Sequence, residues 1–521
     1  MKFRLLLASA VLATASISAY ADTFYVSPEG AGEKTGVDAE NAMGVAEFRA
    51  AAAAQVEGTV FEFAGGTYDI TKPILFPQNQ SVTLLGNAEG ERTVFSAANA
   101  DPDATVAAKA YNAGILFINT VVGDQSEAET PLYPVKISNI DFCDLTTNKS
   151  TNDGALIISA IGIDNSGYVE IENCNFKNNV STTKQGGPAI SSNRSTVYVR
   201  NCNFENNKAG GRGGAVNLRT DKAAKGITVF ENCLFNGNEV NGTDGMGGAV
   251  FAAQAKNVTI SGCTFTGNKA TLKGSVLFAN GHPAGGYAAN MFIINSTIAD
   301  NPAEDGPAIM IGNGSNVGQL YIVNNVIVQK ATEARAATDD VITPQDGGTL
   351  AITSGGYNYL GTVVSGTDTE WAKTTDQQGK DYASIFGTNV LNTTTGLIKP
   401  KTYVQGATGT ELAEAVAEWA LPAHYTVDAE RGEDVAPGAG AFTQQQVSTG
   451  IADIANDADA VKVIALGGGN YTVAGYEGAV EVYSVSGARV LTAVAPELNL
   501  SGLASGVYIV HAGKTVAKVV R

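Results

Sequence analysis

Histidine and charge are both scarce in this chain. The 521 residues contain three histidines, scattered at positions 282, 424 and 511. Zinc sites and Ser-His-Asp triads both use histidine, so this scarcity argues against either chemistry. Charged residues make up 16% of the chain, and 51 acidic against 33 basic residues give a net charge of −18. Because an acidic chain repels nucleic acid and anionic membranes, neither is expected as a partner.

Beyond its start, the chain also lacks a long apolar run. No later stretch reaches the roughly 18 to 20 residues that span a bilayer, so no transmembrane segment is expected. Residues 1–21 have the pattern of a signal peptide: Lys2 and Arg4, an apolar run from Leu5 to Ile17, and the small-x-small sequence Ala19-Tyr20-Ala21. We expect cleavage after Ala21 and an exported protein, located on the outer-membrane surface or in the extracellular medium.

What the chain has instead is an internal repeat. The phrase apolar-x-apolar-x-Asn-Cys-x-Phe, followed by an Asn-rich step and Gly-Gly-Ala-Val, recurs about every thirty residues. Cysteine marks the same position in four copies, and weaker copies lie on both sides, with anchors at Cys174, Cys202, Cys233, Cys263, Ile140, Ser296 and Asn325. Repeats of this length indicate a solenoid, because each unit buries its apolar face only against its neighbours.

The alternation within each repeat predicts the kind of solenoid. Apolar and charged residues alternate through residues 169–172, which is the period of a half-buried strand. The inward set then changes from odd to even positions at Asn173, a residue type that tolerates a left-handed turn. The same change recurs at Asn201 and Asn232. Short strands bent at stacked asparagines, without helical periodicity or leucine-rich spacing, predict a parallel β-helix.

Five cysteines in an exported protein would ordinarily indicate disulfides. Four of them occupy one inward position on successive rungs, about 4.8 Å apart, with parallel Cβ directions that do not suit a disulfide. We therefore favour a ladder of reduced thiols packed as small apolar groups, with rung-to-rung disulfides as the alternative. Cys143 lies off this register and is expected to be another core filler.

Residues 22–330 resemble a known superfamily. Tyr25-Val26-Ser27-Pro28 and Ala64-Gly65-Gly66-Thr67-Tyr68, together with the Asn-Cys-x-Phe and Gly-Gly-Ala-Val repeats, are similar to secreted right-handed β-helix proteins of the pectate-lyase-like superfamily. The resemblance covers most of residues 22–330 and implies the fold rather than one activity, since the superfamily includes lyases, hydrolases and adhesins. We assign residues 22–115 to an N-terminal cap with the first rungs, and residues 116–330 to the repeats. A short helix within Val45 to Val56 would cover the exposed edge of the first rung.

The chain changes character after residue 330. Residues 331–442 are expected to be an irregular closing region with one helix, Glu411 to Ala420. Its end, Asp428-Ala429-Glu430-Arg431-Gly432 and Gly440-Ala441-Phe442, resembles the closing segment of bacterial surface β-helix proteins. Residues 443–450 are polar and predict a linker.

Residues 451–521 are expected to form a separate domain. Apolar runs at Val480 to Ser484, Arg489 to Leu491, Gly506 to Val510 and Val516 to Val520, with glycine-containing turns, predict a small antiparallel β-sandwich. Residues 485–487, 503–508 and 518–521 resemble the C-terminal sorting domain of type IX secretion cargo. The resemblance implies that the type IX secretion machinery is a partner of this domain, and that the protein is then attached to the surface or released. The predicted fold class is therefore all-β: a right-handed parallel β-helix followed by a small antiparallel β-sandwich.

Basic residues gather in one part of this acidic chain. Nine lie between residues 177 and 225, against two acidic residues. Arg200 aligns with Glu172 and Glu231, so a structural ladder of paired charges explains it. Lys184, Arg212 and Lys273 each lie ten residues after an anchor cysteine, just before the Gly-rich step. A basic row along a β-helix would bind an acidic polysaccharide or host-surface ligand through charge-assisted hydrogen bonds. The ligand-binding candidates are Lys184, Lys208, Arg212, Arg219 and Lys273, with solvated turn residues as the alternative interpretation.

No catalytic residue, metal ligand or cofactor is assigned from the sequence. The resemblance to polysaccharide lyases implies an Arg or Lys base, often with Ca²⁺, and Asp300, Glu304 and Asp305 would supply oxygen ligands for Ca²⁺. An acidic surface turn explains these three residues equally. Hydrolase chemistry needs a pair of carboxylates, and the pair 339–340 lies beyond the repeats. The sequence 281–283 is Gly-His-Pro, which departs from the Gly-His-Gly step of pectin hydrolases.

Three functional hypotheses follow. We favour an exported β-helix protein with an adhesin-like or glycan-binding role, on the cell surface or released. The second is a polysaccharide lyase acting on acidic glycans. The third is a structural component of a surface layer.

Overall fold

The structure is a computed structural model in which the chain divides into two compact units, residues 1–445 and 446–521. Each is described by itself. The structure describes residues 22–54, 57–76, 80–100, 113–118, 133–147, 158–164, 168–182, 186–193, 195–219, 227–253, 257–280, 290–302, 306–312, 318–331, 340–345, 350–363, 371–402, 404–422, 425, 438–441, 462–467, 470–474, 478–484, 488–504, 507–512 and 515–520. The predicted signal peptide, its cleavage site and the predicted linker lie outside these residues. None of the described helices is long and apolar enough to cross a membrane.

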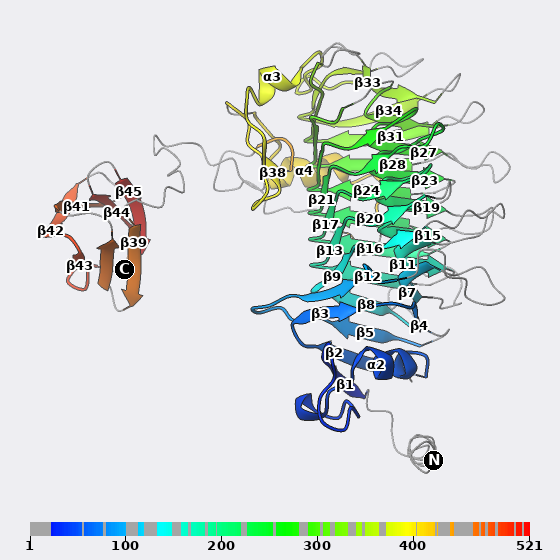
Figure 1. Cartoon of the computed structure of the whole chain (residues 1–521). Coiled ribbons are helices and arrows are strands. Elements are labelled where there is room, and N and C mark those ends of the chain that lie inside the picture. The colour runs from blue at the N-terminus through cyan, green and yellow to red at the C-terminus, as the bar shows by residue number, and fades with distance from the viewer. Residues whose placement is uncertain are drawn as a thin grey trace. The chain divides into compact units, whose positions relative to one another are not determined.

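The first unit is a parallel β-solenoid, as predicted, with rungs stacked in register (Figure 1). One rung runs through β12 (Tyr168–Glu172), β13 (Asn175–Lys177), β14 (Val180–Ser181) and β15 (Ile190–Asn193). Each of these strands pairs in parallel with its counterpart one repeat later, so the rungs build three long sheets and one short sheet.

We name the sheets I to IV. Sheet I contains β12 and β1 (Thr23–Val26), β2 (Thr59–Phe63), β5 (Val82–Leu85), β8 (Val135–Ser138), β16 (Thr196–Arg200), β20 (Ile227–Glu231), β24 (Asn257–Ser261), β28 (Asn290–Ile294), β31 (Gly318–Val323) and β34 (Leu350–Gly356). Sheet II contains β13 and β3 (Gly66–Asp69), β6 (Thr93–Ser96), β9 (Ile140–Cys143), β17 (Asn203–Glu205), β21 (Leu234–Asn236), β25 (Thr264–Thr266), β29 (Thr297–Ala299), β32 (Val326–Val328) and β35 (Tyr359–Leu360).

Sheet III contains β15 and β4 (Ile74–Phe76), β7 (Ala113–Ile118), β11 (Ile158–Asp164), β19 (Val216–Arg219), β23 (Val250–Ala253), β27 (Leu277–Asn280), β30 (Ile309–Ile311), β33 (Asp340–Pro344) and β36 (Thr362–Val363). Sheet IV contains β14 and β10 (Thr146–Thr147), β18 (Lys208–Ala209), β22 (Glu239–Val240) and β26 (Lys269–Ala270).

The bend between sheets I and II occurs at the predicted asparagines. Asn173, Asn201 and Asn232 have φ values of 53°, 53° and 52°, in the left-handed region that asparagine tolerates. Each of these residues therefore turns the chain and shifts the inward set of side chains by one position. The change of parity seen in the sequence is thus confirmed as a one-residue corner.

A second set of asparagines lies inside the solenoid. Asn179, Asn207, Asn238, Asn268 and Asn301 are all buried. The Nδ2 of Asn207 donates to Oδ1 of Asn238 at 2.9 Å and to the carbonyl oxygen of Phe176 at 2.9 Å. Asn238 makes the same bonds to Asn268 and Phe204. This internal amide ladder satisfies the backbone at the corner between sheets II and IV, where the strands cannot pair.

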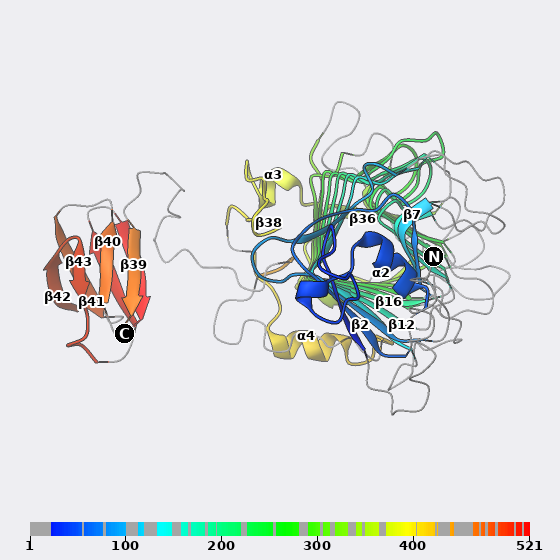
Figure 2. The same ribbon diagram turned by 60° about the horizontal axis from the view of Figure 1, so that its bottom comes forward.

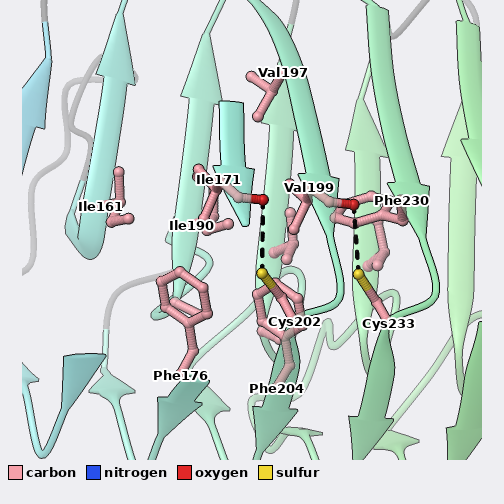
Figure 3. Packing of buried hydrophobic residues seen from close by; sticks show 14 of the residues in the cluster. Ile161, Ile171, Phe176, Ile190, Val197, Val199, Cys202, Phe204, Phe230 and Cys233 are labelled. Atoms are coloured by element: carbon pink, nitrogen blue, oxygen red, sulfur yellow. Dashed lines mark hydrogen bonds between the residues drawn. The ribbon is translucent and has the colours of Figure 1, made fainter. Parts of the chain in front are cut away.

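The core is built from columns of identical side chains. Phe142, Phe176, Phe204, Phe235 and Phe265 form a continuous stack, with ring centroids 4.5–5.2 Å apart and ring planes within 12°. The anchor cysteines form the adjacent column as buried free thiols, which agrees with the favoured reduced ladder. The Sγ of Cys202 donates to the carbonyl oxygen of Ile171, and that of Cys233 to Val199 (Figure 3).

The prediction for Cys143 was wrong. Cys143 ends β9 in register with Lys177, on the outward row of sheet II, and it is half-buried rather than part of the core. The inward neighbour is Phe142, which is fully buried. Desolvation, followed by the nearby charges of Asp141 and Asp144, raises the pKa of the Cys143 thiol to about 12. This thiol is therefore protonated at neutral pH.

A short helix closes the N-terminal end of the solenoid, as predicted (Figure 2). A 3-10 turn, η1 (Ala39–Asn41), precedes α2 (Val45–Ala52), which buries Phe48 completely. The Phe48 ring packs edge-on against Phe61 and Phe63, both at 4.9 Å between centroids. The helix thereby covers apolar side chains that a solenoid end would otherwise expose.

The closing segment, by which we mean the described residues from 371 to 441, folds back along the solenoid. It contains α3 (Tyr382–Ile385), β37 (Leu391–Asn392), β38 (Leu397–Ile398) and α4 (Gly409–Val416). Apolar side chains around α3 and β38 cover the outward face of sheet II, and those around α4 cover the outward face of sheet I. The Tyr425 hydroxyl donates to Oγ of Ser261 at 2.7 Å, far back along the solenoid. The predicted helix is present, but it begins two residues earlier and ends at Val416.

The second unit consists of two small antiparallel sheets. One contains β39 (Lys462–Gly467), β40 (Asn470–Ala474) and β43 (Glu497–Asn499); the other contains β42 (Arg489–Val494), β41 (Ala479–Ser484), β44 (Val507–Ala512) and β45 (Thr515–Val520). Val473 and Leu498 from the first sheet share one apolar cluster with Val480 and Val510 from the second. The strands of the second sheet correspond to those expected from the sequence, whereas β39, β40 and β43 were not predicted, and a sandwich arrangement stays a prediction.

Candidate functional site

The Gly-rich step places one side chain per rung beside sheet III. Arg212, Met246 and Lys273 are joined from rung to rung by single parallel bridges, just before β19, β23 and β27. Each precedes a left-handed glycine, and a Cβ at Gly213 would lie 2.0 Å from the carbonyl oxygen of Val216. Only glycine allows this tight turn. The repeated glycines therefore hold these three side chains in one row.

Two arginines lie within electrostatic range of each other at the first rung of this row. Arg212 is half-buried, with its guanidinium 5.1 Å from the centroid of the Phe251 ring. Arg219 ends β19 and lies close enough for its charge to act on Arg212. Burial is the main cause that lowers the pKa of Arg212, and the charge of Arg219 lowers it further, while Asp244 raises it. The Arg212 guanidinium therefore lies within electrostatic range of a second cation, Arg219, and of the exposed carboxylate of Asp244.

The floor beneath the arginines is apolar. Phe251 and Phe278 are outward-facing residues of β23 and β27, and their rings stack at 5.3 Å with planes 4° apart. Met310 continues the column and Met246 packs against it. A planar guanidinium on an aromatic ring is weakly hydrated and attracted to the ring face, so this floor orients Arg212.

Lys273 lies on the same row, two rungs from Arg212 and therefore about 10 Å away along the solenoid axis. We define the basic site as Arg212, Arg219 and Lys273 with the floor of Met246 and Phe251. The predicted candidate Lys184 lies outside the described residues.

Lys208 has a different environment from the basic site. It lies on sheet IV, where its Nζ is 3.7 Å from the carboxylate of Glu239, which is also 3.4 Å from Lys269. The predicted ladder at Arg200 is also present, since its Nε donates to Glu231 at 2.9 Å. Its second carboxylate is Glu170, at 3.9 Å, rather than the predicted Glu172. These cations are neutralised within the structure.

Counting residues from the anchor cysteines did not identify Met246, Phe251 or Asp244 as neighbours of the basic site. Met246 follows its anchor by thirteen residues rather than ten, because its rung contains a three-residue insertion around Asp244. The glycine after Met246 could have shown that Met246 belongs to this row, because every member of the row precedes a left-handed glycine.

Among the described residues, no group of three or more His, Cys, Asp or Glu side chains is placed to hold a metal ion. Asp300 pairs with Lys330. Glu304, Asp305, His282 and Asp339 lie outside the residues that the structure describes.

Comparison with known proteins gave one family match and several structural matches. No curated protein matches the sequence. The chain is similar to the solved structure of pectate lyase Pel9A, with 16% identity and a TM-score of 0.36 over 83% of this chain and 98% of that one. It is similar to a rhamnogalacturonan lyase, with 13% identity and a TM-score of 0.34 over 75% and 98%. A mutant of the PL6 family alginate lyase AlyGC gives 12% identity and a TM-score of 0.29 over 75% and 56%. Residues 213–339 match the family model described as a right handed beta helix region, so this part of the chain is a right-handed β-helix.

Proposed function

We propose that this protein is an exported β-helix protein that binds acidic glycans through the basic site. The observation that supports this most directly is Arg212, half-buried over the Phe251 ring and within electrostatic range of Arg219, in a chain of net charge −18. Two like charges brought together repel each other, and burial of one increases that penalty. A carboxylate placed between the two guanidinium groups would relieve both effects.

The geometry suits a sugar acid in particular. A guanidinium presents its N–H donors as a planar fork, which matches the two oxygens of a carboxylate. Lys273 continues the row two rungs further, so an extended chain lying along the solenoid axis would meet a second cation. Phe251 is buried beneath Arg212, so the half-buried side chain of Met246 is the apolar part of the floor that a sugar ring would contact. An adhesin-like role at a host surface that displays such glycans is consistent with the same contacts.

Removing the three charges is expected to weaken binding. The triple variant Arg212→Ala, Arg219→Ala, Lys273→Ala should bind polygalacturonate or alginate ~10-fold more weakly or worse, because charge-assisted hydrogen bonds contribute about 1.5–3 kcal/mol each. The salt dependence of binding should flatten as well, since exposed ion pairs weaken with ionic strength. Isothermal titration at several salt concentrations measures both effects.

A matched control removes three cations that lie outside the basic site. Lys136, Lys177 and Lys269 form surface ion pairs with Glu170, Glu205 and Glu239 at 3.3–3.6 Å. Their triple alanine variant has the same net charge as the site variant and should bind nearly as the unmodified protein does. Equal weakening in the two variants would mean that overall charge, rather than the basic site, determines binding.

A lyase acting on acidic glycans is the second candidate, favoured by the lowered pKa of Arg212. In this reaction the neutral guanidine of Arg212 would take the proton from the carbon next to the carboxylate, the electron pair of that C–H bond would form a carbon–carbon double bond, and the glycosidic oxygen would leave and take a proton from water. Incubation with acidic polysaccharides then produces an ultraviolet-absorbing unsaturated product. Arg212→Lys should abolish that product while most binding is retained. If the unmodified protein forms no product, the lyase hypothesis is wrong and the protein is a binding protein only.

The export route forms a second part of the proposal. Removal of residues 1–21 and passage through the type IX secretion machinery, directed by residues 451–521, would place the solenoid on the outer-membrane surface or in the medium. The second unit has its own apolar cluster, separate from the solenoid core. A change in the second unit is therefore expected to leave the solenoid folded.

Deleting residues 451–521 is expected to trap the protein in the periplasm. Cell fractionation with immunodetection locates the truncated chain, and circular dichroism of the purified chain reports whether its β structure is retained. A truncated chain that still reaches the cell surface would contradict the sorting role.

A further inference from the structure

A second polar surface lies on the outward face of sheet I, away from the basic site. Asn257, Asn290 and Gln319 are direct neighbours on β24, β28 and β31 and form one row of half-buried carboxamides. The Nδ2 of Asn290 donates to Oδ1 of Asn257 at 3.1 Å. The row therefore presents uncharged groups that both donate and accept hydrogen bonds, repeated at the rung spacing of about 4.8 Å.

Aromatic side chains lie immediately beside this row. Phe292 and Tyr321 occupy the next outward positions on β28 and β31, and their rings stack at 4.7 Å. Trp419 of the closing segment packs at 5.4 Å from Tyr321 and 6.2 Å from Phe292. Tyr321 and Trp419 are both half-buried, so part of each ring faces the surface. The Tyr321 hydroxyl donates to Oε1 of Gln319 at 3.0 Å, which joins the aromatic group to the carboxamide row.

The charged side chains that the described part of the closing segment brings next to this surface are acidic. Helix α4 and the turn after it carry Glu411, Glu414 and Glu418, all exposed. The Glu411 carboxylate accepts a hydrogen bond from Tyr357 and two at the helix N-terminus, so it is held as an anion. An acidic ligand would be repelled here, and a cationic ligand would be drawn to the glutamates rather than to the carboxamide row.

We propose that the row Asn257–Asn290–Gln319 and the rings of Tyr321 and Trp419 form a second binding surface, specific for uncharged saccharide chains. The apolar face of a pyranose ring would lie against the exposed part of the Trp419 and Tyr321 rings. The equatorial hydroxyl groups of successive sugars would exchange hydrogen bonds with successive carboxamides. This surface is independent of the basic site and differs from it in ligand charge.

The chain contains two tryptophans, at positions 371 and 419, which gives a direct measurement. In a Trp371→Phe variant of the mature chain, all tryptophan fluorescence comes from Trp419. Titration with cellohexaose, xylohexaose and mannohexaose should shift that emission to shorter wavelength for at least one of the three. Trigalacturonate, the acidic probe, should leave it unchanged. Isothermal titration of the unmodified protein with the same probes checks that the substitution itself does not create or remove binding.

The carboxamides separate binding from a purely structural role of Trp419. Asn290→Ala with Gln319→Ala should weaken binding of the neutral hexasaccharide roughly tenfold or more, without a change in melting temperature. The matched control is Asn175→Ala with Asn203→Ala, an in-register carboxamide pair on sheet II whose row continues to Asp141 and Leu234. No heat or emission change with any neutral hexasaccharide would overturn the proposal, as would equal weakening in the two double variants. The triple alanine variant of the basic site should lose acidic-glycan binding but still bind the neutral hexasaccharide. The two proposals can therefore be rejected independently of each other.

Discussion

Replacing Asn238 with leucine is expected to destabilise the solenoid by about 4 kcal/mol. Oδ1 of Asn238 accepts from both the backbone N–H and the side chain of Asn207, and its Nδ2 donates to the carbonyl oxygen of Phe204. Leucine has nearly the same volume but none of these groups, so it leaves two donors and one acceptor buried without partners. Each such group costs about 1–3 kcal/mol. The midpoint of urea unfolding, followed by circular dichroism, measures the loss.

The same substitution at Asn203 provides the control. Asn203 is half-buried on the outward row of sheet II, where its Nδ2 donates to Asn175 at 2.8 Å. Water can replace that bond, so Asn203→Leu is expected to change stability by less than about 1 kcal/mol. If the two leucine variants unfolded at the same urea concentration, the internal amide ladder would not be a source of stability.

Replacing Phe235 with aspartate is expected to have a still larger effect. Its ring stacks at 4.5 Å against both Phe204 and Phe265, and it is fully buried. Loss of a buried phenylalanine costs about 3–5 kcal/mol, and a carboxylate placed in the cavity adds the penalty of a buried charge. We therefore expect little folded protein at neutral pH, measured as soluble yield and circular dichroism.

The charge contribution can be separated from the lost packing. Phe235→Leu keeps an apolar side chain and is expected to cost about 1–2 kcal/mol. Burial raises the pKa of a carboxyl group, so the folded aspartate variant binds its proton more tightly than the unfolded chain does. Its stability should therefore recover as the pH falls toward the ordinary aspartate pKa of about 3.9 and be lost as the pH rises. Equal stability of the aspartate and leucine variants at neutral pH would contradict the buried position of Phe235.

Much of the fold could be read from the sequence because the repeat imposes strict local rules. The change of parity at Asn173 predicted a corner, and the spacing of Cys202 and Cys233 predicted their common column. The internal amide ladder was missed because an asparagine looks like a surface residue in one repeat alone. Its burial is favourable only because the neighbouring rungs supply Asn207 and Asn268 as partners.

The closing segment could not be predicted to cover sheets I and II. Its own sequence is irregular, and its position depends on apolar residues such as Val229 and Val326 that face outward from distant rungs. Alternation within a strand does not distinguish an outward apolar residue that is covered by another segment from one that is exposed. Cys143 was assigned to the core although alternation with Phe142, the buried residue before it, places it on the outward row.

The basic site, too, could be predicted from the sequence only in part. The row position of Arg212 and Lys273 follows from counting, since both precede a left-handed glycine. The electrostatic contact of Arg219 with Arg212 depends on where the turn before β19 places Arg212, which the sequence does not specify. The ion pairs of Lys208 could have been found by the same counting, because Lys208, Glu239 and Lys269 each lie six residues after an anchor cysteine.

The closing segment also constrains how this chain can change in length during evolution. A β-helix usually accepts duplication of a whole rung, because every ladder is preserved. Here the returning chain is joined to fixed rungs: Tyr425 to Ser261, Ala441 to Thr297, and Ala407 to Asn324. A rung inserted between Ser261 and Asn324 would move these partners about 4.8 Å out of register with one another. Homologous chains that keep the closing segment are therefore expected to differ in rung number only on the N-terminal side of Ser261.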